Sequence, residues 1–208
     1  MAKVNGVKEK VHSPIYDALF VPEKNQQGNP NTFVEEMNRR DPRVIRFFVD
    51  VQNKTRLETN LQAAGVLPSQ NMFEARALRV VVSRIDHQGD DDDPTNTSDA
   101  DFLTQLIYNS VTTLLVGEKT MIEMPTYWFP AGAGVSTVPS HGEPDALATF
   151  RFAEPVFIEP QQNFRVEMLF PQGIPGQGTP KDQFTLASTE GPLRVWVVLD
   201  GYLTRDVQ

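Results

Sequence analysis

Three histidines are the side chains in this sequence best suited to transfer a proton near neutral pH. They are His12, His87 and His141, and each lacks a partner residue at a spacing typical of a catalytic motif. Ser140 precedes His141, but adjacent residues point in different directions and do not form a nucleophile–base pair by themselves. The sequence therefore predicts a protein that is not an enzyme and that needs no cofactor.

A run of four aspartates, Asp90 to Asp93, could supply oxygen ligands to a calcium ion. Asp90, Asp92 and Asp99 are the candidate metal ligands. Their spacing departs from an EF-hand loop, which needs alternating ligands, a glycine at the sixth position and a closing glutamate. Because consecutive carboxylates cannot all point inward, the favoured interpretation is a solvated acidic loop.

The contiguous aromatic residues Tyr127, Trp128 and Phe129 lie between two prolines. Such a cluster can stack on a sugar ring, or it can pack in a core or a subunit interface. We expect packing, and sugar stacking stays open as the alternative.

The net charge of −8 is concentrated in one segment rather than spread along the chain. Residues 86–101 contain seven aspartates and no lysine or arginine, which leaves about −1 for the rest of the chain. A sequence-independent nucleic-acid-binding protein needs a basic stripe, and none stands out in this sequence. Direct binding of nucleic acid is therefore not expected.

The chain contains no cysteine, so disulfides and cysteine-type zinc sites are excluded. Its apolar runs are shorter than the roughly 20 residues that cross a bilayer. The first six residues also lack the apolar stretch of a signal peptide. We expect no membrane span and a protein that is made and kept in a cytoplasm-like compartment.

Segments rich in β-branched and aromatic residues, several of them with apolar residues at alternate positions, predict strands. These segments are residues 44–51, 57–61, 73–85, 111–116, 119–124, 148–152, 156–158, 164–170 and 193–203. Gly117 and Glu118 are predicted to turn the chain between two of them. The last segment is strongly apolar in its middle, which predicts a central strand covered on both faces.

One short helix is predicted after the acidic run, with Ser98 as its N-cap and apolar residues at helical spacing from Phe102 to Ile107. The strands do not alternate with helices, which indicates an all-β protein. We expect an antiparallel β-sandwich, with a single jelly roll as the commonest eight-stranded form. An immunoglobulin-like sandwich and an open barrel stay open.

Residues 1–42 are predicted to form an extended N-terminal arm, and residues 43–208 the β-sandwich domain. The arm begins with basic residues and contains several prolines around short apolar patches. Ile15, Tyr16, Leu19 and Phe20 could form one helical turn or a docking patch. Residues 32–40 could form a short helix capped by Asn31 or Thr32, with Glu35 at the third position.

Three segments carry a resemblance to a known kind of protein: residues 59–68 leading into the strand at Phe73, residues 157–164, and residues 195–202. In their style and order they resemble jelly-roll structural proteins of bacteriophage virions, of the capsid, cement or minor-shell type. The resemblance covers residues 43 to 204 and includes no diagnostic motif. It implies a virion protein, assembled in the host cytoplasm, whose partners are copies of itself and other virion proteins.

Under this resemblance the function is association, and deleting residues 1–22 is expected to abolish assembly and leave a folded monomer. The interface candidates are Ile15, Tyr16, Leu19, Phe20, Tyr127, Trp128 and Phe129. A first alternative is a carbohydrate- or receptor-binding β-sandwich module, which an exposed Trp128 or Tyr202 would favour. A second is a cupin-like enzyme, which is disfavoured because the three histidines do not form a ligand cluster.

Overall fold

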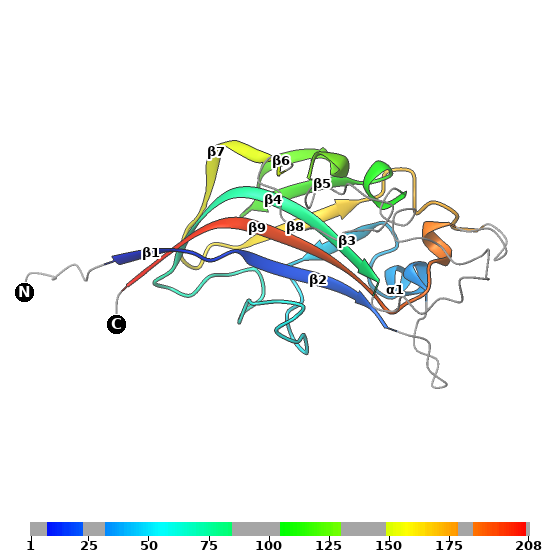
Figure 1. The fold of residues 1–208 in the computed structure, drawn as a ribbon, viewed down its shortest axis with the longest axis horizontal. Coiled ribbons are helices and arrows are strands. Elements are labelled where there is room, and N and C mark those ends of the chain that lie inside the picture. Colours follow the sequence, from blue (N-terminus) through cyan, green and yellow to red (C-terminus); the bar gives the residue numbers. More distant parts are fainter. Residues whose placement is uncertain (1–7, 23–31, 85–104, 130–148, 179–184, 207–208) are drawn as a thin grey trace, which may run out of the picture.

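Two antiparallel β-sheets form the body of the protein (Figure 1). The structure is a computed structural model, and it describes residues 8–22, 32–84, 105–129, 149–178 and 185–206. The two sheets enclose one hydrophobic core, to which residues from both sheets contribute. The prediction of a mostly β protein built as an antiparallel β-sandwich is confirmed.

The first sheet is organised around its longest strand, β9 (Leu193–Asp206). Its other members are β1 (Lys8–His12), β2 (Ile15–Val21), β4 (Met72–Arg84) and β7 (Arg151–Ile158). Along one side of β9, β2 pairs with residues 193–199 and β1 pairs with residues 202–206, while β4 pairs along the other side. The strand order across the sheet is therefore β1 or β2, then β9, β4 and β7.

The second sheet has the order β3-β8-β5-β6. Its strands are β3 (Val44–Phe47), β5 (Val111–Val116), β6 (Lys119–Pro125) and β8 (Phe164–Leu169). Strands β5 and β6 form the predicted hairpin, and Gly117 adopts a positive φ of 61° at its turn. This hairpin prediction is confirmed, and β6 lies at the edge of the sheet.

Four antiparallel pairs are nested along the chain: β5 with β6, β4 with β7, β3 with β8, and β2 with β9. The strands are thus arranged as one long hairpin whose turn is at Gly117. From this turn outward, successive strand pairs belong alternately to the second and the first sheet. This nesting brings the N-terminal strands β1 and β2 beside the C-terminal strand β9, at one edge of the first sheet.

The N-terminal arm prediction is wrong for the part of the arm that the structure describes. Both β1 and β2 are strands of the first sheet, and β2 contributes Ile15, Leu19 and Val21 to the core. This strand was not predicted from the sequence because a charged residue, Asp17, lies in the middle of its apolar segment. Asp17 is fully buried and paired with Lys54, so it does not interrupt the strand.

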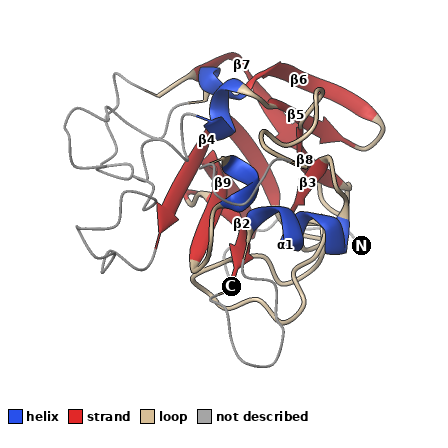
Figure 2. Cartoon of the chain, turned by 90° about the vertical axis from the view of Figure 1, so that its right-hand side faces the viewer, coloured by secondary structure: helices blue, strands red, loops and turns tan. Residues whose placement is uncertain are grey.

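The helix predicted at residues 32–40 is confirmed as α1 (Phe33–Arg40). Thr32 is its N-cap: the Thr32 hydroxyl accepts a hydrogen bond from the Glu35 backbone N–H, and the Glu35 carboxylate accepts one from the Thr32 N–H. Phe33 and Met37 are buried on its inner side. In Figure 2, α1 lies at the end of the sandwich that faces the viewer.

Several strand boundaries differ from the sequence prediction. Strand β3 ends at Phe47, because Phe48 adopts a positive φ of 69° and leaves the extended conformation. Residues 57–61 form no strand; Thr59 makes an isolated bridge to Asp17. The two segments predicted around Pro155 are one strand, β7, whose register against β4 is interrupted.

Strand β9 is central in its sheet, but the prediction that it is covered on both faces is wrong. Val195, Val197 and Leu199 are fully buried, whereas the alternate residues are partly exposed. One of these partly exposed residues is Trp196, on the outer face of β9. Its indole N–H donates a hydrogen bond to the Leu57 carbonyl oxygen at 2.9 Å.

The predicted helix after the acidic run is described in part. Residues 105–108 are helical and Leu106 is fully buried, while the predicted N-cap Ser98 lies outside the described residues.

Candidate functional site

Three exposed aromatic side chains form a row on the surface of the protein. Tyr108 is 68% exposed, Tyr127 46% and Trp128 48%. The rings of Tyr108 and Tyr127 are stacked with centroids 5.7 Å apart, and those of Tyr127 and Trp128 lie 6.1 Å apart. We call Tyr108, Tyr127 and Trp128 the aromatic surface.

Two short elements present this surface. Tyr108 ends the helical turn at residues 105–108, and Tyr127 and Trp128 belong to the 3₁₀ helix η1 (Thr126–Trp128), which directly follows β6. The two elements adjoin because the N–H of Thr126 donates to the Ser110 carbonyl oxygen at 3.0 Å.

Three buried hydroxyl groups lock these elements together. The Ser110 hydroxyl lies 2.6 Å from the Leu106 carbonyl oxygen and 2.7 Å from the Thr126 hydroxyl. The Thr112 hydroxyl, from β5, lies 2.8 Å from the same Thr126 oxygen. Hydrogen bonds satisfied inside the protein rigidify the groups that they connect. The aromatic surface is therefore held in place before any partner arrives.

Further aromatic rings support Trp128 from behind. Its ring meets Phe150 edge-on at 6.1 Å, and Phe150 in turn packs edge-on against Phe129 at 5.6 Å. Phe129 is 1% exposed and belongs to the hydrophobic core. Edge-to-face contacts of this kind stabilise beyond simple burial of area.

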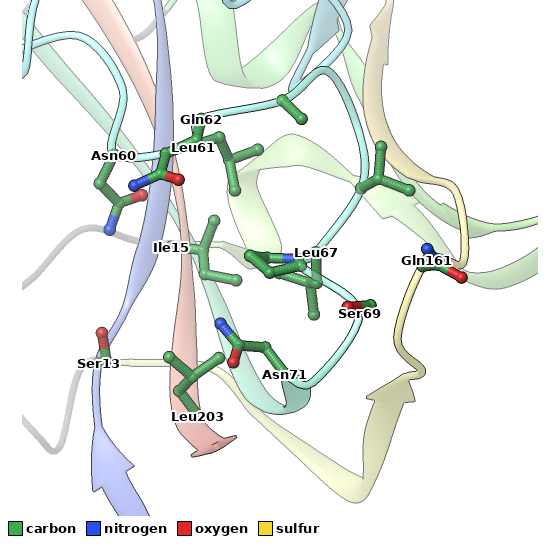
Figure 3. A pocket seen from close by; sticks show the side chains of 13 residues that line it. Ser13, Ile15, Asn60, Leu61, Gln62, Leu67, Ser69, Asn71, Gln161 and Leu203 are labelled. Carbon is green, nitrogen blue, oxygen red and sulfur yellow. The ribbon is translucent and has the colours of Figure 1, made fainter. Parts of the chain in front are cut away.

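A second feature is a pocket of about 500 Å³ between the start of β2, the end of β9 and the loop at residues 60–71 (Figure 3). Its apolar part includes Ile15, Leu67 and Leu203, and amide side chains such as Asn60 and Asn71 lie beside them. None of the described residues that line it is ionisable. The pocket can therefore hold a neutral, partly apolar group but offers no acid or base for catalysis.

The structure separates the seven interface candidates into three kinds. Tyr127 and Trp128 are exposed and belong to the aromatic surface. Tyr16 and Phe20 are partly exposed but engaged within the chain: the Tyr16 hydroxyl donates to the Arg56 carbonyl oxygen at 2.5 Å, and the Arg194 guanidinium lies over the Phe20 ring. Ile15, Leu19 and Phe129 are in the core, so predicting them at an interface was wrong: Ile15 and Leu19 are on the inward side of β2, and Phe129, the residue after η1, is buried.

The residues considered for chemistry are distributed as follows. His12 is on β1, where its Nε2 lies 2.6 Å from Oδ1 of Asp200 on β9. His87, His141 and the candidate metal ligands Asp90, Asp92 and Asp99 lie outside the described residues. Within the described ranges, no group of three or more histidine, aspartate or glutamate side chains is placed to hold a metal ion.

Sequence reasoning missed two of the contacts described above. Tyr108 belongs to a different element and lies 19 residues before Tyr127 in the sequence. No local sequence pattern therefore predicts that the Tyr108 and Tyr127 rings stack. The pairing of His12 with Asp200 joins positions 188 residues apart and depends on β1 lying beside β9. Neither contact had a signal in the sequence.

Comparison with known proteins assigns no relative. No protein-family model matches the chain, and a search of the curated proteins finds no match. Among the residues that the structure describes, no helix has the length and apolar character required to cross a membrane.

Proposed function

We propose that this protein is a virion structural protein, of the capsid, cement or decoration type, that associates with copies of itself or with other shell proteins. Two things support the proposal: the resemblance of three segments to phage structural proteins, and the nested hairpin order. A single jelly roll, a fold common in viral capsid domains, is part of this proposal, and the four nested hairpin pairs divided between two sheets support it. Since a fold does not define a function, the surface must carry the argument.

The aromatic surface is the observation that carries the proposal. Tyrosine and tryptophan are enriched at the centres of protein interfaces, where each can contribute about 2 kcal/mol or more to binding. Exposing three such rings in a fixed, stacked arrangement is costly in water unless a partner covers them. We infer that a neighbouring protein covers Tyr108, Tyr127 and Trp128 in the assembled particle.

The edge strand β6 leads directly into this surface. Its pairing with β5 uses one side, and within the described residues no strand pairs with its other side. Unpaired backbone groups of an edge strand can pair with a strand of another chain. The aromatic surface and the β6 edge are thus adjoining parts of one interface in this proposal.

A carbohydrate-binding module is the second candidate, because Trp128 is about half exposed. An exposed tryptophan or tyrosine ring can stack on a sugar. The edge-on support from Phe150 would fix the ring for that purpose as well. A glycan would need no self-association, and this difference separates the two candidates.

Light scattering of the purified chain tests the proposal. We expect a mass above that of one chain, and a return to one chain when Tyr127 and Trp128 are both replaced by serine, since each lost aromatic contact weakens association by about 30-fold. Leu57→Ser is the control, because Leu57 is an apolar side chain at least as exposed as Tyr127 and Trp128 but lies on the loop beside β9. A wild-type chain that stays monomeric at high concentration would contradict self-association and leave only binding to other shell proteins. A double variant whose mass equals that of an oligomeric wild type would contradict the role of the aromatic surface.

A further inference from the structure

A pocket of about 570 Å³ lies on the outer face of the first sheet, and none of its lining residues belongs to the aromatic surface. Strands β1, β4, β7 and β9 all contribute to it. Its charged and aromatic lining includes His12, Arg76, Arg79, Arg151, Asp200 and Tyr202. We call it the arginine pocket.

A β-bulge brings Arg76 and Arg79 to the same face of β4. Residues three positions apart in a regular strand point to opposite faces. The register of β4 against β9 shifts between Ala75 and Ala77, which inserts one extra residue, Arg76. Ala75 and Leu78 consequently both face the core, and the two arginines both face the pocket.

The pocket carries an excess of positive charge. Three arginines line it, against one carboxylate, Asp200. Asp200 is shared, because it lies 3.2 Å from an Arg79 Nη and 2.6 Å from the His12 ring. Arg76 is paired with Glu74, whereas Arg151 is exposed and forms no ion pair with the described residues.

Arg79 also has donor capacity to spare. Its side chain is 16% exposed, and within the part of the chain that the structure describes its Nε–H has no acceptor. A buried guanidinium donor without an acceptor is costly, and an oxyanion is its strongest complement. The Nε of Arg79 is itself buried, so the donors that Arg79 can offer to a ligand are the N–H groups of its Nη atoms, one of which also faces Asp200. Arg151 and the Nη groups of Arg79 can therefore both donate to a ligand oxygen.

Aromatic rings give the pocket a second kind of contact. The Tyr202 ring lies under the Lys10 ammonium and the Arg76 guanidinium, at 5.0 Å and 5.2 Å from its centre, and Phe152 also lines the pocket. These cations fix the orientation of the ring. A volume of about 570 Å³ lies in the range of small-ligand pockets.

We propose that the arginine pocket binds a ligand of monosaccharide size that carries an oxyanion, either a carboxylate or a phosphate group. Arg79 and Arg151 hold the oxyanion through charge-assisted hydrogen bonds. The body of the ligand lies against Tyr202 and Phe152. This site shares no residue with the aromatic surface and does not depend on the proposed shell function.

Calorimetric titration of the full chain with glucuronate, glucose 6-phosphate and glucose tests this proposal. We expect at least one of the two charged sugars to bind, and glucose to bind about tenfold more weakly or worse, since a charge-assisted hydrogen bond is lost. The charged sugar that binds more tightly identifies the oxyanion as carboxylate or phosphate. Inorganic phosphate is expected to bind more weakly than that sugar, because it lacks the ring.

Two arginine variants locate the site. Arg151→Gln and Arg79→Gln are each expected to weaken binding about tenfold or more. Arg43→Gln is the matched control, because Arg43 is also exposed and without an ion pair among the described residues, and it should bind like the wild type. Arg151→Gln removes no described contact, so it keeps the test valid if Arg79→Gln folds poorly. Absence of binding by both charged sugars, equal binding of glucose, or an Arg151→Gln variant with wild-type affinity would overturn the proposal.

Discussion

Replacing Lys54 by methionine is expected to lower the free energy of unfolding by about 3 to 5 kcal/mol at pH 7, because it leaves a buried carboxylate without its counterion. The carboxylate is that of Asp17, which is fully buried in β2. The Lys54 ammonium lies 2.8 Å and 2.9 Å from its two oxygens. The backbone N–H of Phe48 donates to it as well, at 2.7 Å.

This pair also fixes the course of the chain after β3. Phe48 has left the strand with a positive φ, and its N–H finds an acceptor in Asp17. Lys54 lies six residues further along the same loop. Losing the pair is therefore expected to loosen the loop at residues 48–59 together with β2.

The loss of stability should depend on pH. Burial raises the pKa of Asp17 above its ordinary value of 3.8, and Lys54 is the largest influence that lowers it again. Without Lys54 the pKa of Asp17 rises further, so the folded variant takes up a proton more readily than the unfolded chain does. Protonation then favours the folded state, and the stability difference between Lys54→Met and the wild type shrinks as the pH falls towards 4.

Urea unfolding at pH 8 and at pH 4.5 measures this difference. Lys119→Met serves as the control, because Lys119 is exposed on β6 without an ion pair among the described residues, and its effect should stay within about 0.5 kcal/mol at both values of pH. A Lys54→Met variant that is as stable as the wild type at pH 8 would contradict this account of Asp17. A stability difference between Lys54→Met and the wild type that is larger at pH 4.5 than at pH 8 would also contradict it.

Deleting residues 1–22 is expected to prevent folding, which reverses the expectation from the sequence that a folded monomer would remain. The deletion removes β1 and β2, which cover one full side of β9. It also removes Ile15, Leu19 and Val21 from the core, at about 1.5 to 3 kcal/mol for each buried side chain. The sum, about 4.5 to 9 kcal/mol, is comparable with the 5 to 15 kcal/mol by which proteins are usually stable.

Circular dichroism and urea unfolding of the truncated chain check this prediction. We expect an aggregated or unfolded product without a cooperative transition. Adding a synthetic peptide of residues 8–22 is expected to restore part of the native signal, because the edge of β9 accepts the strand again. A soluble truncated chain that unfolds cooperatively would show that residues 8–22 are an arm after all.

The sequence predicted elements whose signals are local. The capping box at Thr32 and Glu35 located α1 almost to the residue, and Gly117 located the β5–β6 turn. Alternating apolar residues located β4, and a long apolar run located β9. Each of these signals consists of residues a few positions apart, whose preferences do not depend on the rest of the fold.

The features that the sequence did not predict depend on contacts between distant residues. The strand β2 was not predicted because it contains a charged residue, Asp17. The residue that pairs with Asp17 and allows its burial, Lys54, is 37 residues away in the sequence. The β-bulge that brings Arg76 and Arg79 to one face of β4 could not be predicted from the amino-acid composition of the strand. The aromatic surface was half predicted: Tyr127 and Trp128 are neighbours in sequence, but Tyr108 meets them through the buried hydroxyls of Ser110, Thr112 and Thr126.

The solvent accessibility of Trp128 during association tests the central claim, that the aromatic surface is an interface, most directly. The chain has two tryptophans, so in a Trp196→Phe variant all tryptophan fluorescence comes from Trp128. We predict that acrylamide quenches this fluorescence readily in dilute solution, and that quenching falls and the emission shifts to shorter wavelength as the protein associates. Association without any change in quenching would place the interface elsewhere and contradict the claim.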